Sequence, residues 1–200
     1  MADYTTLASV KTSLYIEGTA LNGTQDDAFL STLITRASQY VDTHTNRVFV
    51  GTVQTRYFDP TIDSDGRTLI LDFDLLSPIT ITNGDGSTVA SSDYILLPPN
   101  YTPHYAIKLK SSSSATWSFT DTQENSISVN GTWGYSATVP SDVEQATIRL
   151  VVYWYKLRNT PFYEVSSPDA AFQTITSNIP SDVVAILNRY TRTTISTGGY

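Results

Sequence analysis

The sequence contains no cysteine, and this absence excludes several kinds of chemistry. Without thiols the chain has no disulfide framework, no thiolate nucleophile and no cysteine-based zinc site. Histidine is also scarce, since His44 and His104 are the two that occur, too few for a three-histidine metal centre. We therefore expect no metal site and no cofactor.

Basic residues are few and scattered. The chain has 12 Lys and Arg against 19 Asp and Glu, which gives a net charge of −7. Tight wrapping of nucleic acid requires a basic face that replaces counterions, and the sequence offers none. An acidic protein can still surround DNA loosely, because repulsion keeps the polymer from sticking.

Long apolar runs and targeting signals are missing as well. No segment is long enough to predict a membrane span, so we expect no membrane partner. The N-terminus carries an acid at Asp3 and no apolar region behind it, which predicts no signal peptide and a protein made in the cytoplasm. The hydrophobic content of 40% and the length of 200 residues suit a globular chain with a real core.

Catalytic motifs are absent too. The sequence has no Gly-x-Ser-x-Gly elbow and no glycine-rich phosphate-binding motif. Acids gather in its middle part, where they faintly resemble a calcium loop, but the pattern fits hairpin turns and solvated strand faces better. An alternative hypothesis is a hydrolase that uses two of them as a carboxylate pair. We predict that the protein is not an enzyme and has no catalytic residues. These acids are Asp59, Asp63, Asp65, Asp72, Asp74 and Asp85.

The first 50 residues have helical periodicity. Thr6 can cap a short helix that carries Leu7, Val10 and Leu14, and Thr24 with Asp27 has the spacing of a capping box. Apolar residues then recur at three- and four-residue steps, which predicts an amphipathic helix that ends near residues 43–46. This stripe consists of Phe29, Leu33, Ile34, Ala37, Tyr40 and Val41.

Residues 47–132 change to a Thr- and Ser-rich, β-branched composition with frequent turn signals, which predicts an antiparallel β insertion. The expected strands are residues 48–58, 68–72, 79–82, 94–97, 106–110, 116–119 and 126–133. The expected turns are residues 64–66, 83–86 and 130–131, each of which contains glycine.

A second long helix is predicted over residues 141–157, with Pro140 before it and a Ser141–Glu144 capping box. Two of its faces are apolar. A surface helix of a monomer needs one apolar stripe, so the second face requires a further partner. That partner is either the β insertion or a neighbouring subunit, and the sequence leaves both open. The first face carries Val143, Ala146, Leu150, Trp154 and Leu157; the second carries Ile148, Val151, Val152 and Tyr155, the predicted subunit-interface residues.

The C-terminal part contains an extended stretch, a short helix and a polar tail. Residues 160–178 lack clear periodicity, which is typical of a surface-following segment. The helix that starts at Pro180 places Val183, Ile186, Leu187 and Tyr190 on one side, and about ten residues are not a stable helix alone in water. We therefore expect this side to dock on a partner.

Several segments resemble the head–tail connector (adaptor) proteins of tailed bacteriophages. The N-terminal likeness lies in Asp26-Asp27-x-x-Leu30-x-x-x-Ile34-x-x-Ala37-x-x-Tyr40-Val41-Asp42 and Thr45-Asn46-Arg47-x-Phe49. The β insertion resembles that of longer members through residues 57–98. The clearest likeness is Gly131-Thr132-Trp133-Gly134-Tyr135, followed by Val139-Pro140-x-Asp142-Val143, which is similar to the entry into the last core helix of these adaptors.

The resemblance implies an α+β fold with a small helical-bundle core (residues 1–50 and 133–158), an antiparallel β insertion (51–132) and an extended C-terminal arm ending in a short helix (159–200). It implies a structural virion protein at the head–tail interface, in a homo-oligomeric ring of twelve copies. The portal protein lies above this ring and a tail or stopper protein below, and DNA passes through its lumen without specific binding. The predicted portal-binding arm comprises Val183, Ile186, Leu187, Tyr190, Arg192 and Tyr200.

Aromatic residues support an alternative function. They make up 12% of the chain, with 13 Tyr, and several fall in the β region, among them Trp117 and Trp133. Exposed aromatics on a sheet bind sugars or single-stranded nucleic acid, whereas buried ones serve core and interface packing. The alternative hypothesis is therefore a β-sheet module of a phage particle that recognises a glycan or a host surface.

Overall fold

The computed structural model of the protein describes residues 2–19, 21, 23–158 and 179–193. They belong to two compact units. The helical unit comprises Met1–Thr45 and Pro140–Thr191, and the sheet unit comprises Asn46–Val139 and Arg192–Tyr200. The chain thus leaves the helical unit after Thr45 and returns to it at Pro140. The predicted α+β class is confirmed.

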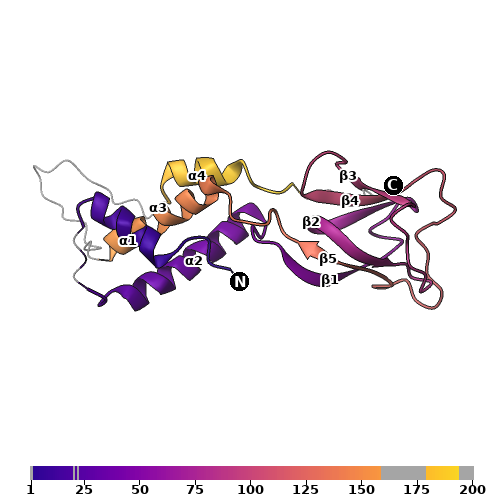
Figure 1. Ribbon diagram of the computed structural model, residues 1–200, viewed down its shortest axis with the longest axis horizontal. Helices are drawn as coiled ribbons and strands as arrows, with labels where there is room; N and C mark the ends of the chain where they lie inside the picture. The colour runs from indigo at the N-terminus through magenta and orange to yellow at the C-terminus, as the bar shows by residue number, and fades with distance from the viewer. Residues whose placement is uncertain (1, 20, 22, 159–178, 194–200) are drawn as a thin grey trace, which may run out of the picture. The chain divides into compact units, whose positions relative to one another are not determined.

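The described part of the helical unit contains four helices (Figure 1): α1 (Leu7–Ile16), α2 (Asp27–Thr45), α3 (Ser141–Leu157) and α4 (Ser181–Asn188). The Thr6 cap is confirmed, because its hydroxyl accepts a hydrogen bond from the Ser9 amide at 3.1 Å. The Ser141–Glu144 capping box is wrong. Pro140 itself occupies the cap position of α3 without a side-chain hydrogen bond, and Ser141 is already helical.

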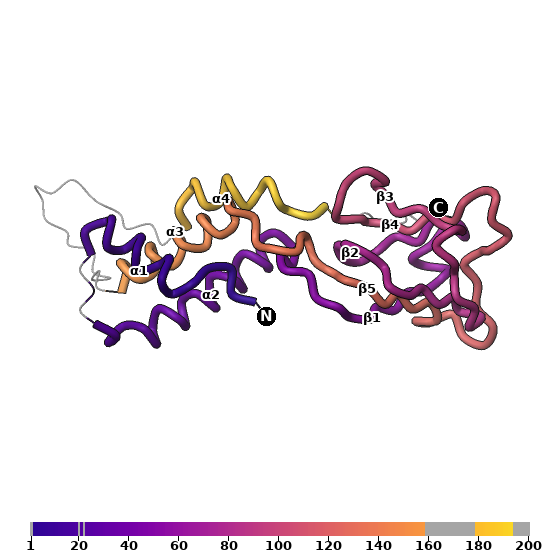
Figure 2. The backbone as a smooth tube through the Cα atoms, in the orientation of Figure 1, coloured from indigo at the N-terminus to yellow at the C-terminus, as the bar shows by residue number. Residues whose placement is uncertain are grey.

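Helix α3 is the centre of the helical unit, since it contacts α1, α2 and α4. Its apolar side chains share one core with residues of α1 and α2, including Val10, Leu14, Leu30 and Ile34. Helix α4 lies beside α3 in the backbone trace (Figure 2), and its Val183 and Leu187 have no exposed surface. The second apolar face of α3 is therefore covered inside one copy of the chain.

The apolar stripe of α2 is shifted from the predicted one. Leu30, which the predicted stripe omitted, is fully buried, whereas Phe29 is 37% exposed. Leu33, Ile34, Ala37 and Val41 are buried as expected. Phe29 instead packs its ring against Tyr155, with 6.3 Å between the ring centres. The spacing of Phe29 fitted the apolar periodicity of the helix, although its side chain lies outside the core.

The sheet unit contains one five-stranded antiparallel sheet in the order β1-β5-β2-β4-β3. The strands are β1 (Thr52–Phe58), β2 (Thr68–Thr82), β3 (Tyr94–Leu97), β4 (His104–Leu109) and β5 (Ile127–Trp133). The first half of β2 pairs with β4 and the second half with β5. Side chains from both halves of the sheet enter one core, which includes Leu71, Ile107, Val129 and Trp133.

The predicted strands 68–72 and 79–82 are parts of one strand, β2. The predicted break between residues 72 and 79 contains Pro78, which lacks the N–H that a sheet ladder needs. The structure places Pro78 at an irregularity, where the register with β5 shifts between Pro78 and Thr80. A proline is tolerated within a sheet at such a bulge, so the strand continues to Thr82.

Two further sheet predictions are wrong. Residues 116–119 form no strand beyond an isolated bridge between Gly84 and Phe119, and residues 130–131 are not a turn but lie inside β5. Gly131 is required there by close packing. A Cβ atom on Gly131 would lie 2.6 Å from the backbone oxygen of Ser77 in β2, closer than real Cβ contacts allow.

The central role of α3 yields a stability prediction. Ile148 is 8% exposed within the helical core, so Ile148→Ala should lower the free energy of unfolding by about 2–5 kcal/mol. Glu144→Ala on the same helix should change it by less than about 0.5 kcal/mol. Urea denaturation followed by far-ultraviolet circular dichroism measures both. If Ile148→Ala left the monomer as stable as the wild type and impaired only assembly, the core position of this side chain would be contradicted.

Candidate interaction surfaces

The predicted subunit-interface residues lie in the core of the helical unit. Ile148, Val151, Val152 and Tyr155 are 8%, 0%, 4% and 5% exposed, respectively. The Tyr155 hydroxyl donates a hydrogen bond to Asp26 at 2.6 Å, so its polar atom is also used inside the unit. The sequence left the β insertion and a second copy open as the partner of this face, and α1, α2 and α4 cover it instead. A surface for assembly has to be sought elsewhere.

The predicted arm residues of α4 are docked as well. Val183 and Leu187 have no exposed surface, and Ile186 and Tyr190 are half-buried. The expectation that α4 folds on another protein was wrong, because the helix packs against α3 and α2 of its own chain. Tyr200 lies outside the described residues. The portal-binding role of the arm stays a prediction.

Ion pairs and hydrogen bonds join α4 to its neighbours. Asp182 pairs with Arg149 of α3 at 2.7 Å, and His44 at the end of α2 lies 2.9 Å from the Asn188 side chain. The helical unit uses most of its charges in ion pairs between elements, although several of these pairs are half exposed to solvent. Its five ion pairs among described residues are Lys11–Asp27, Arg149–Asp182, Lys156–Glu17, Arg158–Asp26 and Arg189–Asp142.

Arg192, another predicted portal-binding residue, is held in the sheet unit. Its guanidinium donates hydrogen bonds to the backbone oxygens of Leu71, at 2.7 Å, and Asp72, and lies 3.5 Å from the Asp74 carboxylate. Burial lowers the pKa of Arg192, and the Asp74 charge opposes that shift. The Arg192 guanidinium thus binds groups of its own chain and is not available to bind a partner.

Asp74 is the centre of this charged cluster. Its side chain is 5% exposed and receives a second arginine, Arg47, at 2.6 Å. A buried carboxylate is stable only when it is paired, and two guanidinium groups meet that need. The cluster was not predicted, although an acid within the apolar run Phe73-Asp74-Leu75-Leu76 was a signal for a buried partner.

Arg56 lies in the same part of the sheet but is more open. It pairs with Asp72 at 2.6 Å, and its guanidinium stacks 4.2 Å from the ring centre of Phe73 and 5.3 Å from that of Trp133. The Asp72 side chain is 59% exposed, so solvent screens this ion pair. Asp72 and Asp74 lie on the same strand, and their carboxylates differ in that the first is exposed and the second is buried.

The clustered acids of the sheet unit serve as turn caps. Asp59 accepts hydrogen bonds from the amide and hydroxyl of Thr61, and Asp65 accepts from the amides of Arg67 and Thr68. These hydrogen bonds lower the pKa values of Asp59 and Asp65. Within the described residues, no group of three His, Cys, Asp or Glu side chains is placed to hold a metal ion. The interpretation as turn residues is confirmed for Asp59 and Asp65, whereas the expectation of a solvated strand face is wrong for Asp74, which is buried in β2.

Burial disfavours the charged form of one carboxylate in the helical unit. Asp42 of α2 accepts a hydrogen bond from the Tyr4 hydroxyl, while its other oxygen is buried without a hydrogen-bond partner. Burial raises the pKa of Asp42 to about 6, and the Tyr4 hydrogen bond partly opposes this rise. The Tyr4 amide donates to Ser38 at 3.0 Å, so the N-terminal segment is attached along α2, as Figure 2 shows.

The sequence matches a known protein family over nearly its whole length. A family model described as "Head completion protein" matches residues 6–193. The chain belongs to the head completion protein family. It is a structural protein of a phage or phage-like virion that acts as a head–tail connector, and it is not an enzyme.

Solved structures of gene transfer agent (GTA) particles have the same fold as this head completion protein. A chain in the "Neck of empty GTA particle computed with C6 symmetry" matches with a TM-score of 0.63 and 18% identity. A chain in the "Neck of native GTA particle computed with C12 symmetry" gives 0.60 and 17%, and one in the "Virion of native gene transfer agent (GTA) particle" gives 0.60 and 18%. Each match covers 96% of this chain and 91% of the other.

The comparison with curated proteins gives no match. The family assignment therefore depends on the family model, which spans nearly the whole chain. The resemblance to connector proteins drawn from the sequence is confirmed. Among the described helices of this head completion protein, none is long and apolar enough to cross a membrane.

The two carboxylates of β2 yield a prediction for the sheet unit. Asp74→Asn removes the buried partner of Arg47 and Arg192 and should destabilise the unit by about 3–5 kcal/mol. Asp72→Asn removes an exposed partner of Arg56 and should cost less than about 1 kcal/mol. Urea denaturation followed by tryptophan fluorescence in a Trp154→Phe background reports on this unit, because Trp117 and Trp133 lie in its core and Trp154 lies in the helical unit. Equal losses in the two variants would contradict the central role of Asp74.

Asp42 yields a pH-dependent prediction. Its folded-state pKa of about 6 lies above the ordinary value of 3.8, so the folded state binds the proton more tightly. The destabilising effect of the carboxylate is thus complete above pH 6, shrinks as pH falls, and vanishes below 3.8. Asp42→Asn should therefore stabilise the protein at pH 8 by about 1–2 kcal/mol, less than the full shift implies because solvent reaches part of the group.

The measurement is the thermal unfolding temperature of both proteins between pH 4 and pH 8. Asp3→Asn is the control, since Asp3 lies on the exposed side of the same segment and accepts a hydrogen bond from Thr35. A constant difference between Asp42→Asn and the wild type across this range would show that the Asp42 pKa is not raised.

Proposed function

We propose that this head completion protein assembles as a closed ring in the neck of the particle, between the portal and the tail, and that the ring continues the DNA channel. The observation that carries the proposal is the family match over residues 6–193. The shared fold with neck proteins of particles described with C6 and C12 symmetry supports it, because a subunit in such a neck occurs in repeated copies.

The charge distribution supports a channel through which DNA passes without binding. Eight of the twelve basic residues pair with acids of their own chain. Arg36 stacks on Trp154, and Arg67 donates to the backbone oxygens of Ser113 and Ala115. Few cations are left to replace the counterions of DNA phosphates, and this replacement provides most of non-specific DNA affinity.

The portal and a tail or stopper protein are the proposed neighbours of the ring. The C-terminal residues after Arg192 are the proposed portal contact, since Arg192 anchors the preceding chain in the sheet unit. Deleting the whole arm from residue 160 would be a poor test. Such a deletion also removes α4, whose Val183 and Leu187 are buried against the helical core. A shorter truncation separates attachment from folding.

The glycan-binding alternative has less support. Trp117 and Trp133 are 6% and 0% exposed, and both indole N–H groups donate hydrogen bonds to backbone oxygens inside the unit. These side chains are unable to stack on a sugar. Tyr57, Tyr101, Tyr105 and Phe119 of the sheet unit are exposed, but exposed apolar and aromatic side chains are common on protein surfaces. No observation favours this function over the connector.

The proposal predicts attachment to portal-bearing heads. Purified protein mixed with DNA-filled heads that carry the portal but lack a neck should add a ring of density below the portal in electron micrographs. A variant that ends at Thr193 keeps all described helices and should remain folded, yet attach at least about tenfold more weakly. Wild-type protein that never attaches would contradict the connector function. Full attachment of the truncated variant would contradict only the role of the arm.

A further inference from the structure

The sheet has two open edges. Its order is β1-β5-β2-β4-β3, so β1 and β3 each pair with a strand on one side. Alternate backbone N–H and C=O groups of an edge strand point away from the sheet and can pair with another strand. Natural proteins protect such edges with short strands, prolines, lysines or bulges, because an open edge invites association.

Strand β1 is less protected than β3, although Arg56 lies within it and Pro60 follows its end. It extends over seven residues in unbroken register with β5, and it contains no proline and no lysine. Val53 and Tyr57 on this strand are 64% and 60% exposed. The opposite edge, β3, has four residues and is followed by Pro98 and Pro99. A long, regular edge with exposed apolar side chains is typical of a strand that is covered in the assembled state.

Acidic side chains accompany the β1 edge. Asp121 and Glu124 are exposed and lie in the connection before β5, whose first residue, Ile127, pairs with the last residue of β1, Phe58. Asp59, which directly follows β1, repels Glu124 electrostatically. Glu124 accepts a hydrogen bond from Thr122. Neither Asp121 nor Glu124 forms an ion pair with a described residue, so this end of β1 carries uncompensated negative charge.

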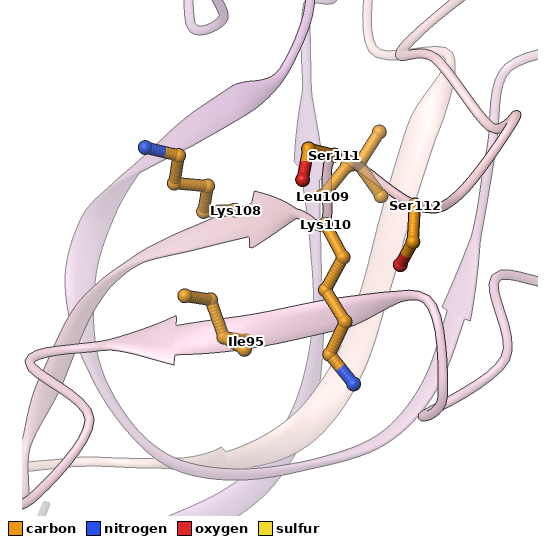
Figure 3. A pocket seen from close by; sticks show the side chains of 6 residues that line it. All are labelled: Ile95, Lys108, Leu109, Lys110, Ser111 and Ser112. Atoms are coloured by element: carbon orange, nitrogen blue, oxygen red, sulfur yellow. The ribbon is translucent and has the colours of Figure 1, made fainter.

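Lysines accompany the β3 edge. Lys108 of β4 is directly opposite the exposed Ile95 of β3, and Lys110 follows the end of β4. Figure 3 shows these side chains around a surface hollow that Ile95, Leu109, Ser111 and Ser112 also line. Lys110 donates a hydrogen bond to the Ser92 backbone oxygen, and Lys108 attracts Asp65 through space. The described residues supply no ion-pair partner for either lysine.

The acids and the lysines lie at the same end of the sheet. Lys108 pairs with Thr68, and the neighbouring Arg67 accepts a hydrogen bond from the Trp117 indole. Ser118, next to Trp117, forms hydrogen bonds with the Asn83 side chain, and Asn83 directly follows the end of β2. The end of β2 pairs with the start of β5, where the acidic connection ends. The two lysines beside β3 and the two acids beside β1 thus lie at corresponding ends of the open edges, and Asp93, which directly precedes β3, is an acid beside the lysines.

We propose that the β1 edge of one copy lies against the β3 edge of the next, so that Asp121 and Glu124 of one copy face Lys108 and Lys110 of its neighbour. The inference depends on the proposed function, because it names the surface through which the copies of the ring meet. A contact between two different edges is heterologous and repeats from copy to copy until the ring closes. A contact between two β1 edges would stop at a dimer and leave the lysines without partners.

Charge reversal tests this interface. Lys108→Glu with Lys110→Glu, and separately Asp121→Lys with Glu124→Lys, should each raise the concentration needed for half-assembly at least about tenfold, because like charges then face each other. A chain with all four substitutions exchanges the two sides and should return to within about threefold of the wild type. Mass photometry measures the oligomers of the protein alone, and electron microscopy measures them on portal-bearing heads.

Two controls make the result specific. Asp3→Lys with Glu144→Lys makes the same charge change as Asp121→Lys with Glu124→Lys, but in the helical unit, and should leave assembly unchanged. Because the chain has no native cysteine, single substitutions Glu124→Cys and Lys108→Cys allow disulfide trapping. A mixture of these two variants, assembled together and oxidised, should give a cross-linked dimer that neither variant gives alone.

The outcomes separate the two proposals. If the wild type forms rings and attaches to heads but the charge variants do the same, the edge interface is wrong and the connector function stands. If the wild type neither assembles nor attaches, both fail. If the double variants lose assembly and the fourfold variant does not regain it, the pairing of these two edges is contradicted.

Discussion

The helical unit depends on the burial of the apolar side chains of α3 against three other helices. Its apolar side chains fill the space between α1, α2 and α4, and each fully buried Leu, Ile or Val contributes about 1.5–3 kcal/mol relative to exposure. Helix α4 has eight residues and would not be stable alone, so it depends on α3 as α3 depends on it. This mutual requirement keeps α4 within the subunit, and it removes the apolar face of α3 that carries Ile148 and Val151 from the candidates for the contact between copies.

The way the chain connects the two units follows from the same constraint. Helices α2 and α3 share a core, although the residues of the sheet unit separate them in sequence. The helical core therefore forms only after the whole sheet unit has been synthesised, whereas all five strands lie in one continuous stretch. Arg192 is the exception, since it returns to the sheet unit from the far end of the chain and joins Asp74. The buried carboxylate thus holds together residues 47, 74 and 192 through charge and not through apolar contact.

Local signals in the sequence predicted most elements, and non-local packing explains the errors. The helix over residues 7–16 and the strand over 94–97 follow from caps, turns and periodicity, which are properties of neighbouring residues. Which element covers a second apolar face is decided by residues far along the chain, so periodicity alone left the partner of Ile148 and Val151 open. Pro78 and Gly131 misled the strand prediction for a related reason, because each is tolerated through the geometry of the adjacent strand. Family likeness supplied the function, which no catalytic motif could have indicated.

Basic charge is informative in this protein because eight of its twelve Lys and Arg residues form ion pairs with acids of the same chain. When most basic residues are paired with acids of the same chain, those that remain mark places where something outside the chain supplies the partner. Lys108 and Lys110 beside one open edge are such residues, and the exposed acids Asp121 and Glu124 lie beside the other. Exposed ion pairs contribute little to stability, so charges at an edge are better suited to specifying which surfaces meet than to holding them together. The backbone groups of β1 and its exposed Val53 and Tyr57 would then provide the affinity, while the charges fix the direction in which successive copies follow one another.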